Sequence, residues 1–255
     1  MIIVDIRRDC FRRNVNVILI LLVVAALGYL AAILFRHYEA ADSREDGKRA
    51  ETCLRLIANG LSNYAESKGN YPASEICDAS GKRLASWRLE ILPWLDGNSF
   101  TGKFNRHWTS YKQIVSSKNV FTMFGRTRRE GSCVSAIVGD DSIFDERNAM
   151  RVSELLRSGG EDVIVLVEVR NMPFHWMAPG DLTVADFDND GICGSVKWIR
   201  DVPGQSFHVC FLDGTIWYLA KDTPARTVRT FMKVETAIMN ERERSLSAYL
   251  TSSEN

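Results

Sequence analysis

Residues 17–35 read VILILLVVAALGYLAAILF, an apolar run without a charged side chain. A helix of this length rises about 28 Å, close to the roughly 30 Å hydrocarbon core of a bilayer. The run therefore predicts a transmembrane helix. Two alternatives stay open. The first is a cleaved signal peptide, although its apolar region is usually shorter and ends in small residues. The second is a buried core helix, although such a helix is rarely apolar on all sides over this length.

The stretch that follows, residues 36–68, predicts a polar stalk and then an amphipathic helix. Its apolar residues recur at steps of three and four and form a single stripe: Cys53, Leu54, Ile57, Leu61, Tyr64 and Ala65. The sequence Gly69-Asn70-Tyr71-Pro72 ends this helix, because proline cannot continue it. The first 68 residues are thus expected to form one long helix, continuous or interrupted, whose apolar first half crosses the membrane and whose second half is amphipathic.

Residues 69–221 mix strand and helix signals and predict an α+β body. Strands are expected at residues 133–138, 162–170 and 195–200, and a short helix at residues 152–157. Two β-rich runs, at residues 207–212 and 215–220, flank Asp213-Gly214, which predicts a hairpin with a type I′ turn. Residues 222–255 are expected to form a C-terminal helix and tail. The predicted fold is α+β, a long N-terminal helix packed on a mostly antiparallel sheet through Leu54, Ile57 and Leu61.

The charge balance argues against nucleic acid as a partner. The 255 residues hold 32 Lys and Arg and 32 Asp and Glu, so the formal net charge is zero, whereas phosphate binding favours a basic surplus. Hydrophobic residues make up 45% and charged residues 25%, which is typical of a globular chain and excludes a disordered one.

Basic residues are densest just before the apolar run, at Arg7, Arg8, Arg12 and Arg13. The basic residues after the run are interspersed with acidic residues. The positive-inside rule then predicts a cytoplasmic tail at residues 1–16 and an exported body. The expected protein is a single-pass protein of the inner membrane, in contact with the lipid bilayer.

Nine short pieces between Cys53 and Ala220 follow one another in a recognisable order. They are Cys53-Leu54 with Asn63-Tyr64, Gly69-Asn70-Tyr71-Pro72, Asp78 with Gly81-Lys82, Ser86-Trp87-Arg88 with Ile91-Leu92-Pro93-Trp94-Leu95, Trp108, Ser135-Ala136-Ile137-Val138-Gly139, Val165-Leu166-Val167-Glu168, Trp176 with Asp181-Leu182, and Val209, Phe211 and Asp213-Gly214. In this the chain resembles a large bacterial family of pilin-like proteins with a domain of unknown function. That family is labelled prepilin-type-processing-associated, after a motif of His, nine residues and Asp-Gly.

The resemblance implies a pilin-like or pseudopilin-like fold and a structural or interaction role at the cell envelope. The implied partners are other envelope or secretion-system proteins, and no catalysis is expected. An anchored module that binds a ligand or matrix component outside the cytoplasm is the alternative.

Three departures from the family pattern stand in the chain. Pro203 occupies the position of the motif His, and Arg13-Asn14-Val15-Asn16 stands where a prepilin cleavage signal would precede the apolar run. Processing by a prepilin peptidase is therefore not expected. The Cys-Pro pair of the family is Met123-Phe124 here, which removes the disulfide partner that the resemblance implies for Cys53.

The six cysteines contain no C-x-x-C pair, which argues against a zinc or thioredoxin-like site. Cys193 and Cys210 flank neighbouring strand-like segments. They are expected either to pair with each other or to act as small buried hydrophobic side chains.

The sequence Asp186-Phe187-Asp188-Asn189-Asp190-Gly191 is the metal-like motif of the chain. Alternating carboxylates in a tight turn point oxygens at one centre, as Ca²⁺ requires. Asp186, Asp188 and Asp190 are therefore candidate calcium ligands. Lys197 stands where an EF-hand places its glutamate, so an EF-hand is excluded and an ordinary acidic loop is the alternative.

Other reactive side chains carry weaker signals. No two of the four histidines lie two to four residues apart, and His208, on a predicted strand, is expected to have a structural or a surface role. Glu168 ends a predicted buried strand and is an acid–base candidate without a second carboxylate at a defined spacing. Arg126, Arg128 and Arg129 predict a small basic loop, and the six tryptophans are expected to be mostly core, with an exposed subset as a potential binding surface.

Overall fold

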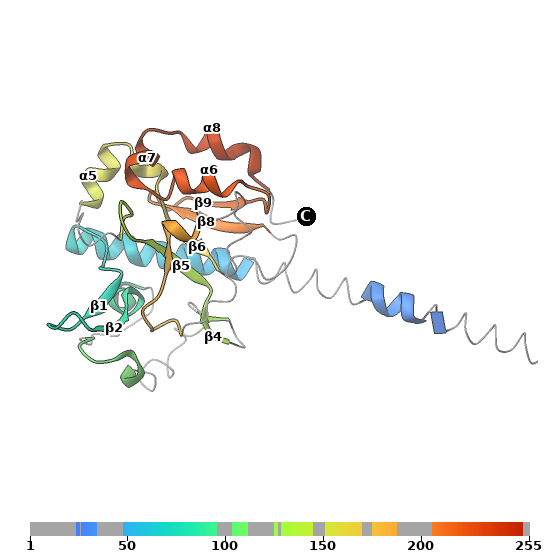
Figure 1. Ribbon diagram of the computed structural model, residues 1–255, viewed down its shortest axis with the longest axis horizontal. Coiled ribbons are helices and arrows are strands. Elements are labelled where there is room, and N and C mark those ends of the chain that lie inside the picture. Colours follow the sequence, from blue (N-terminus) through green and yellow to red (C-terminus); the bar gives the residue numbers. More distant parts are fainter. Residues whose placement is uncertain are drawn as a thin grey trace, which may run out of the picture. The chain divides into compact units, whose positions relative to one another are not determined.

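A computed structural model describes the chain at residues 24–25, 27–34, 48–95, 104–111, 125–126, 129–144, 151–169, 175–187 and 206–251. The chain divides into two units, Met1–Asp46 and Gly47–Asn255. In the first unit, residues 24–25 and 27–34 are helical. The second unit holds the sheet and the remaining elements (Figure 1).

The predicted membrane-spanning half of a long helix is wrong for the part of the chain that the structure describes. None of its helices is both long enough and apolar enough to cross a bilayer. The helix at residues 48–68 carries charged side chains such as Arg49, Glu51 and Arg55, which do not suit a hydrocarbon core. The remainder of residues 17–35 lies outside the described residues.

The helix at residues 48–68, here named the core helix, follows the predicted amphipathic stripe. Leu54, Ile57 and Leu61 are fully buried, and Cys53, Ala58 and Ala65 nearly so. The amide of Gly69 donates to the carbonyl of Ala65 over 2.7 Å, and Gly69 adopts a φ of +90°. This left-handed residue ends the helix at the predicted place because glycine tolerates a positive φ.

The described strands include a five-stranded mixed sheet in the order β7-β5-β6-β8-β9. Its strands are β5 (Val134–Val138), β6 (Ile164–Glu168), β7 (Leu182–Thr183), β8 (Phe207–Phe211) and β9 (Ile216–Leu219). The β5–β6, β6–β8 and β8–β9 pairs are antiparallel, whereas β7 joins β5 in parallel. The parallel edge was not predicted, because β7 is too short to leave a pattern in the sequence.

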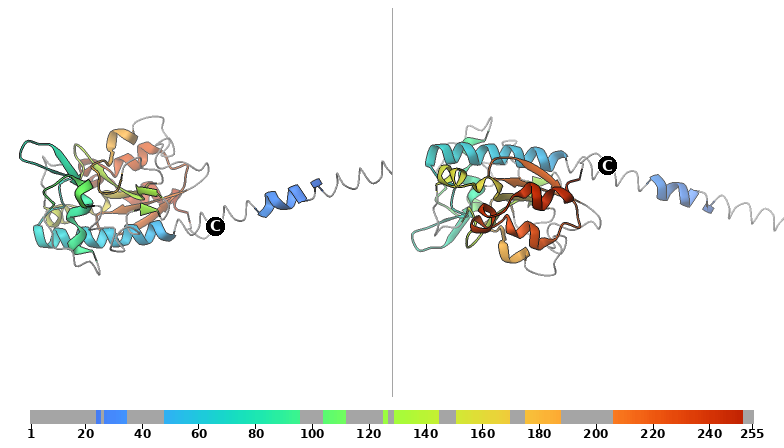
Figure 2. Two further views of the ribbon diagram at one scale, coloured as in Figure 1. Left: turned by 90° about the horizontal axis from the view of Figure 1, so that it is seen from below. Right: turned by 90° about the horizontal axis from the view of Figure 1, so that it is seen from above.

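Both faces of the central strands are covered. Every residue of β6 and β8 is buried. Figure 2 shows the core helix along one side of the sheet and the C-terminal helices on the other. This explains why residues 164–168 read as a continuous apolar run rather than an alternating one.

The hairpin of β8 and β9 forms where Asp213-Gly214 predicted it, but its turn is not type I′. That turn needs a positive φ at both central residues. Gly214 has a φ of +82°. Asp213 does not have a positive φ, because Asp141 is the one non-glycine residue with a positive φ in the described part of the chain. The amide of Gly214 donates to the carbonyl of Phe211 over 2.9 Å, so the loop is a three-residue turn with glycine in the left-handed position.

Smaller elements frame the sheet. A hairpin of β1 (Glu75–Cys77) and β2 (Arg83–Ser86) leads into the short helices α2 (Trp87–Glu90) and η1 (Leu92–Trp94). The others before the C-terminus are η2 (Trp108–Tyr111), β3 (Gly125–Arg126), β4 (Arg129–Ser132), α5 (Val152–Arg157), η3 (Gly160–Asp162) and η4 (Val184–Phe187). The predicted strand at residues 195–200 lies outside the described residues.

The C-terminal region consists of short helices rather than the single helix that its composition predicted. These are α6 (Ala225–Thr230), α7 (Val234–Ile238), α8 (Arg242–Leu246) and η6 (Ser247–Tyr249). Phe231 and Met232 follow α6 and are fully buried. The carbonyl of Phe231 accepts a 2.6 Å hydrogen bond from the amide of Ile164, so the chain turns inward at this point instead of continuing as a helix.

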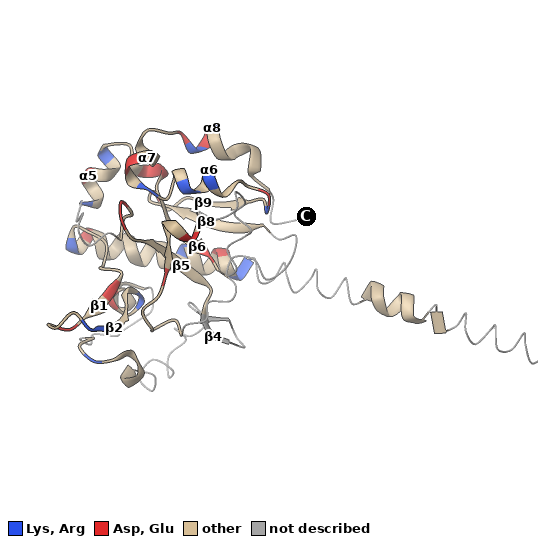
Figure 3. Ribbon diagram, in the orientation of Figure 1, with Lys and Arg blue, Asp and Glu red and all other residues tan. Residues whose placement is uncertain are grey.

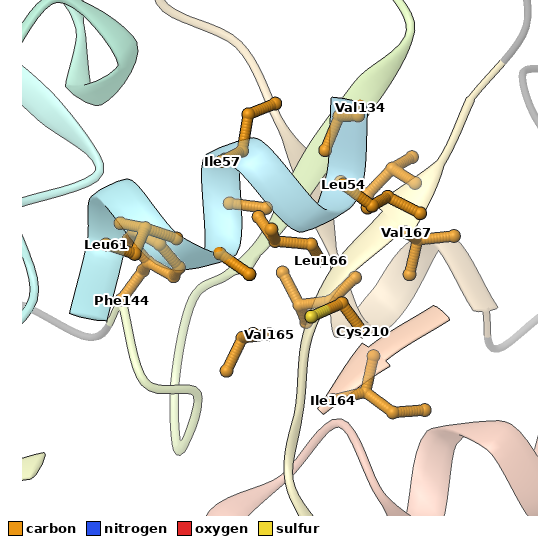
Figure 4. Packing of buried hydrophobic residues seen from close by; sticks show 14 of the residues in the cluster. Leu54, Ile57, Leu61, Val134, Phe144, Ile164, Val165, Leu166, Val167 and Cys210 are labelled. Carbon is orange, nitrogen blue, oxygen red and sulfur yellow. The ribbon is translucent and has the colours of Figure 1, made fainter. Parts of the chain in front are cut away.

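The core forms where the core helix meets β5 and β6. Figure 4 shows Leu54 near Val134 at one end of the drawn helix and Leu61 near Phe144 at the other, with Leu166 between them. Leu54, Leu61 and Leu166 are fully buried, as are Ile57 and Val134. The stripe on the helix and the sheet face therefore form a single apolar cluster.

Candidate functional site

A cleft of about 510 Å³ opens between the β7 edge of the sheet and helix α6. Its sheet side comes from the ends of β5 and β7, and its helical side from α6 and the start of α7. The lining residues are Val138, Gly139, Asp140, Thr183, Val184, Ala185, Arg226, Arg229, Thr230, Lys233 and Thr236.

The basic side chains of the cleft follow from how α6 is buried. Ala225 and Val228 face the core and are fully buried, which leaves positions 226 and 229 for the cleft. Lys233 follows as the residue that precedes α7. Arg226, Arg229 and Lys233 thus line one cleft at spacings of three and four residues, and Figure 3 shows the blue segments on α6.

The sheet side of the cleft is held by short-range hydrogen bonds. The backbone turns at Gly139, whose φ is +107°, and both the amide and the hydroxyl of Ser142 donate to the Gly139 carbonyl, over 3.2 and 2.8 Å. The amide and hydroxyl of Thr183 donate to Oδ2 of Asp186 over 2.7 and 2.8 Å. These contacts fix the position of the threonine against the basic helix.

Guanidinium, ammonium and hydroxyl groups are donors for carboxylates, phosphates and sulfates. Asp140 is the carboxylate in the lining. The volume of the cleft lies within the range of small-molecule sites, about 300–1,000 Å³. The arrangement therefore suits an anionic group, whether on a small molecule or on another protein. The sequence prediction missed this cleft, although the basic residues at 226, 229 and 233 were a visible signal.

A second polar cluster is entirely internal. The guanidinium of Arg88 contacts the carboxylate of Asp181, with Nη2 2.6 Å from Oδ1 and Nη1 3.1 Å from Oδ2, and the two side chains are 1% and 2% exposed. Arg88 also donates to the hydroxyl of Ser86 and the carbonyl of Val134, over 2.8 and 2.7 Å. Because no solvent reaches this pair, its role is to join α2 to the sheet.

The carboxylate of Asp181 accepts three further hydrogen bonds, from α2 and from β5. The donors are the indole of Trp87 at 3.0 Å, the hydroxyl of Ser135 at 3.1 Å and the amide of Ala136 at 2.8 Å. The structure thus brings together three pieces of the sequence pattern, Ser86-Trp87-Arg88, the β5 strand and Asp181-Leu182.

Glu168, the acid–base candidate, is buried beside His208. Its Oε2 lies 2.8 Å from Nδ1 of His208 and accepts a 3.1 Å hydrogen bond from the His208 amide. Both side chains are at most 3% exposed, and the ring of His208 packs on Tyr218 with centroids 4.4 Å apart. Buried in this way, the pair links β6 to β8, and His208 lies inside the sheet layer as its position on a strand indicated.

Arg242 forms a third cluster near the hairpin turn. Its Nη2 donates to Oδ2 of Asp213 over 2.6 Å, its Nε lies 3.2 Å from Oδ1 of Asp162, and its guanidinium stacks over Phe211. Partial burial raises the pKa of Asp162. Burial also acts to raise the pKa of Asp213, but hydrogen bonds from Arg242 and Thr215 outweigh it and lower that pKa below its usual value.

The structure describes only one of the three predicted calcium ligands. Asp186 lies in η4, where it accepts from Thr183, while Asp188 and Asp190 lie outside the described residues. Among the residues that the structure does describe, no group of three His, Cys, Asp or Glu side chains is placed to hold a metal. The calcium loop therefore stays a prediction.

The remaining candidates are dispersed. His175 stacks on Trp108, with ring centroids 4.8 Å apart, and both lie away from His208 in the sequence and in their contacts. Trp87 and Trp176 are core residues, as expected. Arg126 and Arg129 lie in the β3–β4 hairpin, and Arg128, like Cys193 and Trp198, lies outside the described residues.

Comparison with known proteins gives a partial match. No curated protein and no solved structure matches the chain. Residues 51–122 match the model of a family described as "Protein of unknown function (DUF1559)". This segment contains most of the core helix and α2, and so holds Ser86, Trp87 and Arg88 of the buried cluster but not Asp181. Over residues 51–122 the chain is therefore similar to a family whose function is unknown.

Proposed function

We propose that this chain is a pilin-like structural and interaction protein of the cell envelope, with its body outside the cytoplasm, and that it acts by binding rather than by catalysis. The observation that carries the proposal is the cleft beside α6. Its lining brings together the charged donors of Arg226, Arg229 and Lys233, which suit the recognition of an acidic group.

The burial of Glu168, the acid–base candidate, and of other titratable side chains supports a binding role. Glu168 and His208 face each other inside the sheet, and Asp181 faces Arg88 in the core. Catalytic groups must contact a substrate, usually within hydrogen-bond reach in an accessible pocket. These buried pairs instead connect elements of the fold.

The pilin-like build is supported by the ordered sequence pieces and by the family match at residues 51–122. The partner that best fits the cleft is an envelope or secretion-system protein presenting a carboxylate. Such a contact would rest on charge complementarity with Arg226, Arg229 and Lys233.

Site-specific photo-crosslinking of the full chain in cells tests this proposal. A photoreactive residue at Thr230, in the cleft, should yield a protein adduct, and Arg226→Glu should abolish it. The same residue at Arg244, an exposed position on α8, is the matched control and should yield none. Equal adducts from both positions, or none that depends on Arg226, would contradict the proposal. Protease added to intact spheroplasts should digest the body, and protection would contradict the external location.

The alternative, a binding module for a small anionic ligand, is favoured by the volume of the cleft. Under it, phosphate, sulfate or citrate should raise the melting temperature of the purified chain by binding the folded state. The increase should disappear in Arg226→Glu and persist in Arg244→Glu. An increase that is the same in all three proteins would reflect salt and would exclude a specific anion site in the cleft.

A further inference from the structure

Two cysteines that lie far apart in the sequence meet at the base of the core. Cys53 belongs to the core helix, and Cys133 stands between β4 and β5. The residues are 7% and 8% exposed, and their side chains share a hydrogen bond. Their thiols are therefore already in contact within the folded chain.

The backbone holds both cysteines in place. The carbonyl of Cys133 accepts a 2.9 Å hydrogen bond from the amide of Val169, which continues the pairing of β5 with β6. Leu54 and Val134, the residues that follow the two cysteines, are fully buried in one core cluster, and Figure 4 shows both at the same end of the drawn helix segment. The contact of the two thiols thus follows from the packing of the helix on the sheet.

The surroundings make one thiol the better nucleophile. The hydrogen bond with Cys133 is the main influence that lowers the pKa of Cys53, and the charge of Arg49 lowers it further. The same hydrogen bond and the burial of the side chain raise the pKa of Cys133. A thiolate is the attacking species in thiol–disulfide exchange, so Cys53 is the residue that would react first.

We propose that Cys53 and Cys133 form an intrachain disulfide. The oxidant is a disulfide, either a small one such as oxidised glutathione or that of a protein oxidase. The Cys53 thiolate attacks one of its sulfurs and expels a thiolate. Cys133 then attacks the mixed disulfide at Cys53 and expels the second thiolate. Two protein thiols become one disulfide, the oxidant is reduced to two thiols, and the two protein protons pass to them.

Such a bond would tie the core helix to β5 and close the chain between residues 53 and 133. It would take over the role of the disulfide that Met123-Phe124 excludes. The pairing rests partly on the proposed location, since disulfides persist outside the cytoplasm. The experiment therefore separates the pairing itself from where the chain resides.

Peptide mapping of the purified full chain identifies the bond directly. Trypsin releases Cys53 in peptide 50–55 and Cys133 in peptide 130–147, each with a single cysteine. After incubation of the folded chain with oxidised glutathione, the two peptides should appear linked under non-reducing conditions. Reduction should then lower the melting temperature by roughly 5–15 °C, because the closed loop is long. This dependence on reductant should vanish in the Cys53→Ala/Cys133→Ala variant and persist in Cys77→Ser.

If the two peptides stay unlinked in the folded, oxidised protein, or if Cys53 is found linked to another cysteine, the pairing is wrong. Mapping needs no variant, so it decides the matter even where the double variant fails to fold. Rapid alkylation of cells before lysis provides the second arm. Linked peptides from cells support both the pairing and the external location, whereas a bond that forms in vitro but not in cells supports the pairing and contradicts the location.

Discussion

Replacing Asp181 by alanine should destabilise the fold by about 3–5 kcal/mol, because it leaves the guanidinium of Arg88 buried without its counter-ion. The lost carboxylate also accepts hydrogen bonds from Trp87, Ser135 and Ala136. Each donor left without an acceptor in the interior costs about 1–3 kcal/mol when no water replaces it. The loss is therefore expected at the upper end of the range.

Urea unfolding followed by circular dichroism measures this loss in the purified chain. Glu75→Ala is the matched control, since it also removes a carboxylate that pairs with an arginine. Its partner, Arg83, is 56% exposed, so this control should cost less than about 1 kcal/mol. The difference between the two variants isolates the effect of burial.

The second variant, Arg88→Met, completes a double-mutant cycle with Asp181→Ala. Removing both charges abolishes the unpaired buried charge, so the double variant should be less destabilised than the sum of the single variants. The reasoning would be refuted if Asp181→Ala cost no more than Glu75→Ala, or if the two core substitutions were strictly additive.

Three further predictions concern the core, the turn and pH. Leu61→Ala should cost about 2–5 kcal/mol in urea unfolding, since the side chain is fully buried; a cost under 1 kcal/mol would contradict its packing on the sheet. Gly214→Ala should cost about 1 kcal/mol because of the positive φ, and Gly214→Asn less; equal stabilities would argue against this turn. The pKa of Asp213 is lowered in the folded state, so its contribution is present above pH 4 and is lost as the pH falls through the folded pKa. Urea midpoints between pH 2 and pH 7 should therefore fall more steeply in the wild type than in Asp213→Asn, and parallel curves would contradict the role of Arg242.

Local patterns in the sequence predicted several elements correctly. The amphipathic stripe located the core helix, the apolar run at residues 162–170 located β6, and the short helix predicted at residues 152–157 is α5. These signals depend on residues close together in the chain, where periodicity and turn chemistry operate. The membrane-spanning helix predicted from the hydropathy of residues 17–35 is wrong for the described residues, none of whose helices is both long enough and apolar enough to cross a bilayer.

The candidate site was not predicted from the sequence. Its basic residues belong to a region read as one mixed-charge helix, and its other wall comes from residues 138–140 and 183–185. The break of the chain at Phe231 and the parallel β7 strand together create the cleft. Neither the break nor the parallel pairing has a strong local signal.

The sequence by itself thus determined the helix, the main strands and the hairpin, because each is specified by the spacing of apolar residues and by glycine at defined positions. Only the tertiary structure decided which distant residues meet. Arg88 and Asp181 are 93 residues apart, and Cys53 meets Cys133 across a comparable span. The cleft likewise joins the ends of β5 and β7 to α6. These long-range contacts depend on the order of the strands and on how the helices pack against the sheet. Both are determined by the burial of the whole core, so no short stretch of sequence specifies them alone.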